Sequence, residues 1–296
     1  MSRGRRPPPR PWSEIWPYAA IVLTCACALE RDVEVALPPY ERQPAVEAYL
    51  TPGEPFTLLL TRSSSFFDPF PDDDLAYVED LLLPGAEVRV RFGEEEVVLR
   101  EGRFVEPFAG RFANYGSEAL VPANFADSFL LEVDLPDGTG VRAGTVILPP
   151  VPIDENAVAW GQGRDGDSAL ASLTTYVVDP DPARTNYFHK VVTHRPIDST
   201  VTQEFAFSDD FADQARLSTG TDFAFRRGDT VYVYLAHVDA AYERYAISLL
   251  AAVASNGNPF AQPSPILGNV RGVGGADPLG IFTGYAYVRE RVVIGE

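Results

Sequence analysis

The two cysteines of the chain are the residues with the clearest chemistry, and they stand together near the amino terminus. Cys25 and Cys27 follow a short apolar run, residues 18–24, which arginines precede. A basic segment, a short apolar core and a cysteine beside small residues are typical of a bacterial lipoprotein signal, in which the thiol receives a lipid. Because small Ala26 precedes Cys27, we prefer Cys27 as the attachment residue, with Cys25 as the alternative.

Other interpretations of this segment stay open. It also fits a plain secretory signal or an uncleaved anchor, in which both cysteines are simply small residues of the apolar core. The apolar run is too short to cross a bilayer as a finished helix. If cleavage precedes Cys27, no free thiol remains, and the exported chain then has no disulfide.

Acidic loops are the next candidates for chemistry. A long irregular segment contains Asp72, Asp73 and Asp74, and a later turn contains Asp179 and Asp181. Carboxylates of this kind could bind a ligand or calcium, but calcium needs several converging oxygens and none of these groups has the complete spacing of an EF-hand. Solvated acidic turns are the competing interpretation, so we expect no resident cofactor and keep calcium as the alternative.

No catalytic motif accompanies these residues. The sequence lacks a nucleophile elbow, a His-Glu-x-x-His helix, a P-loop and a dinucleotide fingerprint. His189 and His194 lie five residues apart on one expected strand, so they point to opposite faces and are unsuited to one shared metal. We expect no catalytic residue, and a glycan hydrolase acting through paired carboxylates remains as an alternative.

The elements that position these residues are predicted to be mostly strands. Short runs that alternate with a period of two and end at proline or glycine are typical of β structure. The expected strands cover residues 33–35, 45–49, 56–62, 85–92, 96–99, 128–134, 141–148, 173–178, 186–193, 205–207, 222–225, 230–235 and 280–288, and a last alternating strand follows to residue 294.

Proline-rich residues 149–152 suit a boundary between modules, because prolines are stiff and donate no backbone hydrogen bond. We therefore expect a mainly β chain in which residues 1–27 are the lipoprotein signal and anchor cysteine. Residues 28–150 form an N-terminal immunoglobulin-like or transthyretin-like β-sandwich. Residues 151–296 form a second sandwich-like β domain.

One segment of that second domain is predicted to be helical. Asp239 can cap a helix, and Tyr242, Tyr245, Leu249 and Val253 recur at helical spacing after it. The pattern predicts one amphipathic helix over about residues 239–255, packed against a sheet.

Composition limits the classes of partner. The formal net charge is −18, from 42 acidic and 24 basic residues, so phosphate backbones are repelled and nucleic acid is excluded as a partner. Hydrophobic residues make up 46% of the chain, enough to build a core instead of a disordered tail.

Several short motifs, taken in order, carry a family resemblance. They include Val35–Tyr40, Ala45–Tyr49, Pro84–Val88, Leu267–Val270 and Leu279–Phe282. Together they resemble the domain of unknown function 4249 family of Bacteroidetes-type outer-membrane lipoproteins, over nearly the whole mature chain. The resemblance implies an outer-membrane lipoprotein, often encoded near TonB-dependent receptors, with no established enzymatic activity.

We therefore expect a lipid-anchored, non-catalytic protein of the outer membrane that is an accessory or ligand-binding partner of a TonB-dependent transporter. A structural or adhesive surface protein is the alternative. Glu30, Asp32 and Glu34, shortly after the anchor, favour the cell surface over the periplasm. The sequence leaves open whether the ligand is a small molecule, a peptide or a glycan.

Overall fold

The chain is mainly β, as its period-two pattern predicts. The computed structural model describes residues 40–65, 74–106, 110–125, 127–162, 168–195, 203–210, 216–255 and 264–295, and residues 42–296 form one compact unit. Cys25 and Cys27 lie outside the described residues, as do Glu30, Asp32, Glu34, Asp72 and Asp73.

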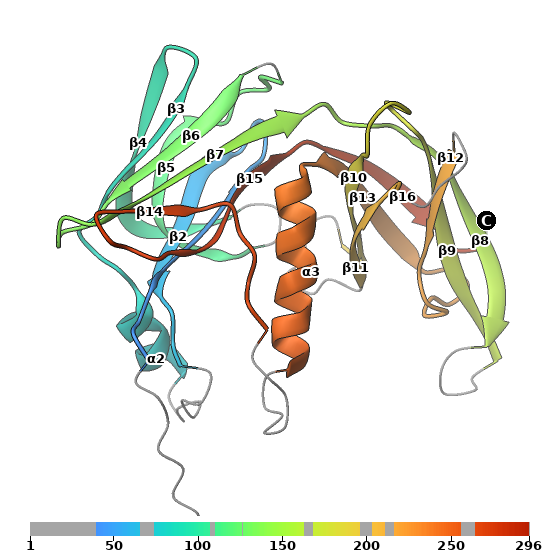
Figure 1. The fold of residues 1–296 in the computed structure, drawn as a ribbon. Coiled ribbons are helices and arrows are strands. Elements are labelled where there is room, and N and C mark those ends of the chain that lie inside the picture. The colour runs from blue at the N-terminus through green and yellow to red at the C-terminus, as the bar shows by residue number, and fades with distance from the viewer. Residues whose placement is uncertain are drawn as a thin grey trace, which may run out of the picture. The chain divides into compact units, whose positions relative to one another are not determined.

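The first sheet of this unit closes on itself (Figure 1). Its strands are β1 (Pro44–Leu50), β2 (Pro55–Arg62), β3 (Glu87–Phe92), β4 (Glu95–Val105), β5 (Phe112–Leu120), β6 (Ser128–Asp134), β7 (Gly140–Leu148) and β15 (Leu279–Tyr285). They are hydrogen-bonded in the order β7-β15-β1-β2-β5-β4-β3-β6, and β6 pairs again with β7. A short strand, β14 (Arg271–Val273), adds to the edge of β7.

Alternating side chains fill the interior of this closed sheet. On β1, Val46, Ala48 and Leu50 are at most 2% exposed and belong to the main hydrophobic core, whereas Glu47 points to the outer face. Inside, Phe92 packs between two other phenylalanine rings at centroid distances of 5.8 and 5.1 Å. The interior is therefore a packed core, and the outer face of β1 is free to line a site.

The structure does not divide into the two expected β-sandwiches. β15 comes from the C-terminal part of the chain, yet it lies parallel to β1 over the register Ala45↔Leu279 to Leu50↔Gly284. It also pairs with β7, so it closes the sheet that the N-terminal strands begin. Residues 28–150 therefore do not form a separate immunoglobulin-like sandwich, because the strand that completes their sheet is supplied from beyond residue 270.

Two further sheets pack face to face. One holds β11 (Gln203–Ser208), β10 (Tyr187–Thr193), β13 (Thr230–Val238) and β16 (Tyr287–Val293), and the other holds β12 (Arg216–Gly220), β9 (Ser168–Val178) and β8 (Ile153–Gln162). Phe188 and Val233 from the first meet Leu173 and Leu217 from the second in one core. Fully buried Lys190 crosses this core and donates a hydrogen bond from Nζ to the carbonyl oxygen of Thr219, 2.9 Å away.

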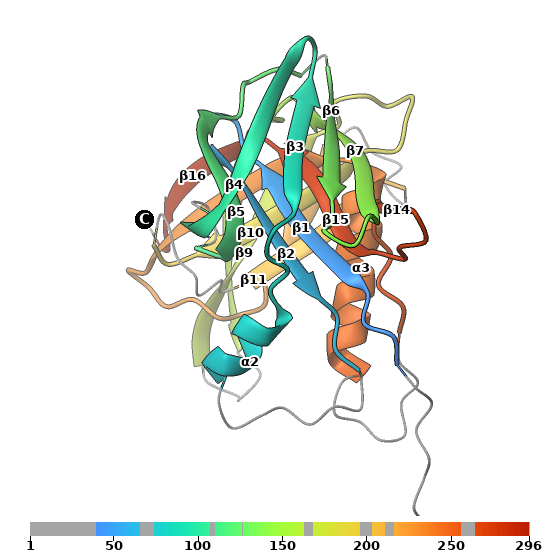
Figure 2. The same cartoon turned by 90° about the vertical axis from the view of Figure 1, so that its left-hand side faces the viewer.

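Two helices complete the described fold. The predicted helix is confirmed as α3 (Ala240–Ser255), whose N-cap Asp239 accepts a hydrogen bond from the Tyr242 amide at 2.8 Å. It packs against β15, β10 and β11. The second helix, α2 (Asp74–Leu81), begins where only a loop is expected from the sequence, and it lies near the ends of β1 and β2 (Figure 2).

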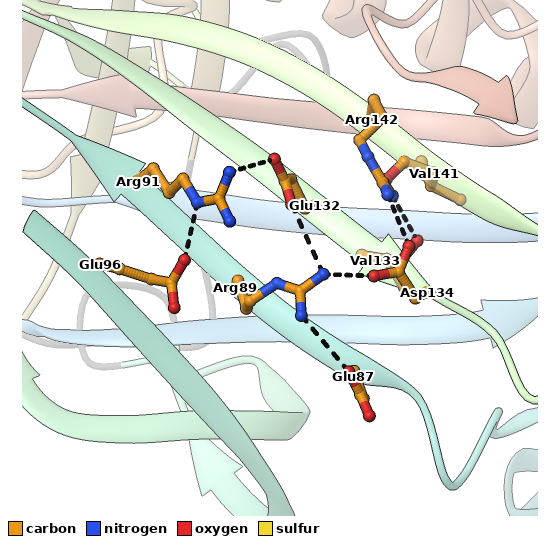
Figure 3. A network of polar contacts seen from close by, with 9 residues as sticks. All are labelled: Glu87, Arg89, Arg91, Glu96, Glu132, Val133, Asp134, Val141 and Arg142. Atoms are coloured by element: carbon orange, nitrogen blue, oxygen red, sulfur yellow. Dashed lines mark hydrogen bonds and ion pairs between the residues drawn. The ribbon is translucent and has the colours of Figure 1, made fainter.

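An ion-pair network covers the outer face of β3, β6 and β7 (Figure 3). Arg89 contacts Glu132 and Asp134, and Arg91 contacts Glu132 at 3.0 Å. Arg142 donates to the other oxygen of Asp134 at 2.5 Å. On β3, Arg89 and Arg91 alternate with buried valines. The network and the core therefore favour the same register, since a slip of β3 by one residue would bury its arginines.

Asp134 is expected to contribute to acid sensitivity through this network. The hydrogen bond from Arg142 is the main cause that lowers the pKa of Asp134 in the folded protein. The ionised carboxylate therefore stabilises the folded state above the unfolded pKa of aspartate, and this stabilisation is lost as pH falls below about 4. Because the carboxylate is 39% exposed, Asp134→Asn should cost only about 1 kcal/mol at neutral pH. Urea unfolding measured down to acidic pH should show a flatter acid limb for the variant.

The matched control is Glu118→Gln on the exposed end of β5. It should change neither the free energy of unfolding nor the acid limb. An Asp134→Asn protein with the wild-type acid limb would remove this network from the causes of acid unfolding.

Candidate ligand-binding site

A cavity of about 460 Å³ lies on the outer face of β1, β2 and β5, beside α2, and we call it the β1–β5 groove. Its size falls within the range of about 300–1,000 Å³ that small-molecule sites occupy. The groove is lined by Glu47, Tyr49, Thr57, Leu58, Leu59, Thr61, Val78, Leu81, Glu106, Arg111, Phe112 and Ala113. Most of these face away from the core because they alternate with core residues along each strand.

Helix α2 supplies one wall of the groove. Val78 and Leu81 line it, and the residues that follow α2 fix it to β2, since Leu82 bridges to Thr61 and the Leu83 amide donates to the Leu60 carbonyl at 3.1 Å. Val78 is 45% exposed and Phe112 is 39% exposed. The groove thus presents apolar surface to solvent between a sheet and a helix.

Arg111 is the cation of the groove. Its guanidinium lies over the Tyr49 ring, 4.7 Å from the ring centroid, a cation–π arrangement. Burial opposes its charge, but oxygens around it, including those of Tyr49 and Glu204, raise the pKa of Arg111, so it stays cationic. Within the described part of the chain, its side chain makes no hydrogen bond or ion pair.

A cluster of tyrosines adjoins the groove beside Tyr49, and all but the partly buried Tyr287 are buried. Tyr285 of β15 is its centre, with ring centroids of Tyr49, Tyr242 and Tyr287 at 5.9, 5.8 and 4.7 Å. Tyr49 also donates a hydrogen bond to Glu47 at 3.3 Å. Burial raises the pKa of each of these four phenols, so they remain neutral hydrogen-bond donors at ordinary pH.

A polar chain leads from this cluster to the surface. The hydroxyl of Tyr287 lies 3.2 Å from Nδ1 of His189, and Nε2 of His189 lies 2.7 Å from the Glu204 carboxylate. The hydrogen bond with His189 is the main cause that lowers the pKa of Glu204. His189 is only 2% exposed, so this chain fixes the buried ring and anchors β11 to β10 and β16.

The acidic candidates of the sequence lie elsewhere. Asp179 and Asp181 occupy the turn between β9 and β10, where buried Asn186 donates to the Asp179 carboxylate at 3.0 Å and to the Asp181 carbonyl at 3.1 Å. Asp181 also pairs with Arg184 at 2.7 Å. Asp74 is the first residue of α2. Asp179 and Asp181 thus stabilise the turn through these contacts.

These turn carboxylates border a second cavity of about 630 Å³, which the proline-rich residues 149–152 also line. In the described ranges, no three His, Cys, Asp or Glu side chains come together as a candidate metal group. The structure therefore brings Asp179 and Asp181 into one turn without assembling around them a set of metal ligands among the described residues.

The sequence did not indicate the groove, since Arg111 and Glu106 belong to no motif and Tyr49 ends a family motif, Ala45–Tyr49, to which no role was assigned. The tyrosines of α3 were predicted as core residues from their spacing, and Tyr242 and Tyr245 are indeed buried at 4% and 3% exposure. A usable signal was a second pair of closely spaced tyrosines, Tyr285 and Tyr287, in addition to the pair on the helix. Two such pairs suggest one shared layer of tyrosines.

Comparison with known proteins adds one match. A family model described as Domain of unknown function (DUF4249) matches residues 30–291, which is most of the chain. No curated protein matches it. None of the helices in the described ranges has the length and apolar character needed to span a membrane.

Proposed function

The chain belongs to the DUF4249 family, whose model covers residues 30–291, and from that premise we propose that it is a lipid-anchored, non-catalytic ligand-binding protein of the outer membrane. Its partner in this proposal is a TonB-dependent transporter, as the family resemblance implies. The groove beside α2 is the observation that carries the binding role, because it combines a pocket of ligand size with apolar walls and a cation.

The polar chain around His189 favours binding over catalysis. A catalytic acid or base needs reach to a substrate, whereas His189 is enclosed between Glu204 and Tyr287. Its two ring nitrogens are both occupied, so it supports the wall of the site. We therefore assign no catalytic residue and propose that the site binds its ligand unchanged.

Lipid attachment is tested by a matched pair of cysteine variants. Cys27→Ser should move the protein from the membrane fraction to the soluble fraction, because it removes the thiol that receives the lipid, whereas Cys25→Ser should leave it in the membrane fraction. Intact-mass analysis of the wild-type protein should show a lipid on Cys27. The reverse pattern would place the lipid on Cys25, and an unmodified chain in the soluble fraction would end the anchor proposal.

The partnership is tested by affinity purification from detergent-solubilised native membranes. A TonB-dependent receptor recovered in stoichiometric amount with the tagged protein is the expected result. A lipidated protein that purifies alone would instead favour the structural or adhesive alternative.

A further inference from the structure

The charged residues of the β1–β5 groove differ in how many hydrogen-bonding partners they have. Glu47 already accepts a hydrogen bond from Tyr49 at 3.3 Å, and Glu106 is only 4% exposed. The guanidinium of Arg111 lies over the Tyr49 ring, with the oxygens of Tyr285 and Glu204 nearby, and it forms no hydrogen bond or ion pair with any described residue. Its five N–H donors are therefore the strongest hydrogen-bonding groups of the groove that are left unused by the described residues.

Other arginines of the chain show that the guanidinium usually binds carboxylates here. Arg89, Arg91 and Arg216 each contact at least two carboxylates, on surfaces where acidic residues are abundant. Arg216 also stacks on an aromatic ring, that of Tyr176, but it keeps two carboxylate partners. Arg111 differs because it lies in a groove and has no ion pair with a described carboxylate to complement its stacking on Tyr49. A stacked guanidinium is held in one orientation, which prepares it to bind a planar anion through two hydrogen bonds.

The remaining walls indicate the body of the ligand. Leu59, Phe112 and Ala113 from the sheet and Val78 and Leu81 from α2 line the groove. Large apolar side chains that stay 39–45% exposed here would lose that exposure to an apolar ligand. The groove therefore combines apolar walls with one cation, Arg111.

We propose that the β1–β5 groove binds an apolar monocarboxylate, with the carboxylate on Arg111 and the aliphatic or aromatic body between β2, β5 and α2. A single negative charge fits better than a phosphate dianion, because Glu47 and Glu106 line the same groove and would repel additional charge. The inference rests on the proposed binding function and names its ligand class.

The test uses the full chain carrying Cys25→Ser and Cys27→Ser, which has no thiol for lipid attachment and therefore needs no detergent. Isothermal titration calorimetry compares three probes with the same body: 4-phenylbutanoate, 4-phenylbutanol and 4-phenylbutylamine. The carboxylate should bind at least about tenfold more tightly than the alcohol, because only the anion forms charge-assisted hydrogen bonds with Arg111.

Variants of the groove locate the binding. Arg111→Gln should weaken 4-phenylbutanoate at least about tenfold and Arg111→Lys by less, since lysine keeps the charge but loses the planar fork. Val78→Asp on exposed α2 should weaken binding independently, by placing a charge in the apolar wall. Arg103→Gln is the control, because Arg103 is an 84% exposed arginine on β4.

Each other outcome overturns the ligand class. Tighter binding of the amine would make Glu47 or Glu106 the anchor, and equal binding of all three probes would leave Arg111 without a role. No binding of any probe would also reject the class, even if the receptor still co-purifies with the lipidated protein. If the carboxylate binds as expected but no receptor co-purifies, only the transporter partnership is rejected.

Discussion

Replacing Lys190 with methionine is expected to stabilise the protein by about 2 kcal/mol at neutral pH. Lys190 is fully buried between two sheets, and among the described residues its ammonium has one hydrogen-bond partner, the Thr219 carbonyl at 2.9 Å. Burial lowers the pKa of Lys190 from 10.5 to about 8, which corresponds to a cost of about 3 kcal/mol for holding the charge in the folded protein. Methionine removes that cost and loses one hydrogen bond of about 1 kcal/mol.

The pH dependence of this effect has a definite sign. The unfolded chain holds the lysine proton more tightly than the folded protein, so between about pH 8 and pH 10.5 stability rises with pH. Below about pH 8 both states are protonated and the full cost is present. The advantage of Lys190→Met should therefore shrink as pH rises through that window.

Urea unfolding of both proteins from about pH 7 to about pH 10 measures this difference. Deprotonation of tyrosines in the unfolded chain lowers stability near the upper end, but it affects both proteins equally and cancels in the difference. Lys190→Arg is the matched variant: arginine cannot shed its proton, so it should keep the cost at every pH. A methionine variant that is less stable than the wild type at neutral pH would contradict the account.

Local patterns predicted those elements whose two faces differ clearly. β6 has the predicted bounds, Ser128–Asp134, because Phe129, Leu131 and Val133 enter the core while Glu132 joins the surface network. The helix α3 follows from its Asp239 cap and its spaced tyrosines. In each case, short-range sequence already contains the information that the fold uses.

The missed strand β5 shows why the rest could not be predicted. Its buried residues include Asn114 and Gly116, which disfavour strands in isolation. Asn114 is tolerated in β5 because its side chain replaces a backbone partner of Leu60. Its Oδ1 accepts a hydrogen bond from the Leu60 amide at 2.7 Å, and its Nδ2 donates one to the Leu60 carbonyl at 2.9 Å. Such a bond spans more than fifty residues of sequence, so no local period indicates it.

The candidate groove was unpredictable for the same reason. Tyr49, Val78 and Arg111 come from β1, α2 and the segment before β5, and only the closed sheet brings them together. The tethering of β15 beside β1 is equally long-range, since an apolar run such as residues 279–285 does not specify its neighbour. The position of β15 therefore depends on contacts with β1 that no local pattern specifies.

Replacing Gly280 with alanine is expected to cost about 4 kcal/mol, because two penalties act at one residue. Gly280 has a φ of +113°, which side chains rarely adopt, and it is opposite Val46 in the pairing of β1 with β15. A Cβ at this position would lie 1.9 Å from the Val46 carbonyl oxygen and 2.9 Å from its nitrogen. Backbone atoms of a central strand cannot give way, so β15 must move away from β1.

Gly53→Ala is the control that separates these penalties. Gly53 also has a positive φ, +85°, but a Cβ there meets no atom within 4 Å, so only the backbone strain of about 1 kcal/mol applies. Urea unfolding followed by fluorescence gives both free energies. If the two variants lose equal stability, the approach of β15 to β1 contributes nothing. If Gly280→Ala also lowers the denaturant slope, part of the surface is already exposed in its folded state, because the strand that joins the C-terminal part to the closed sheet has detached.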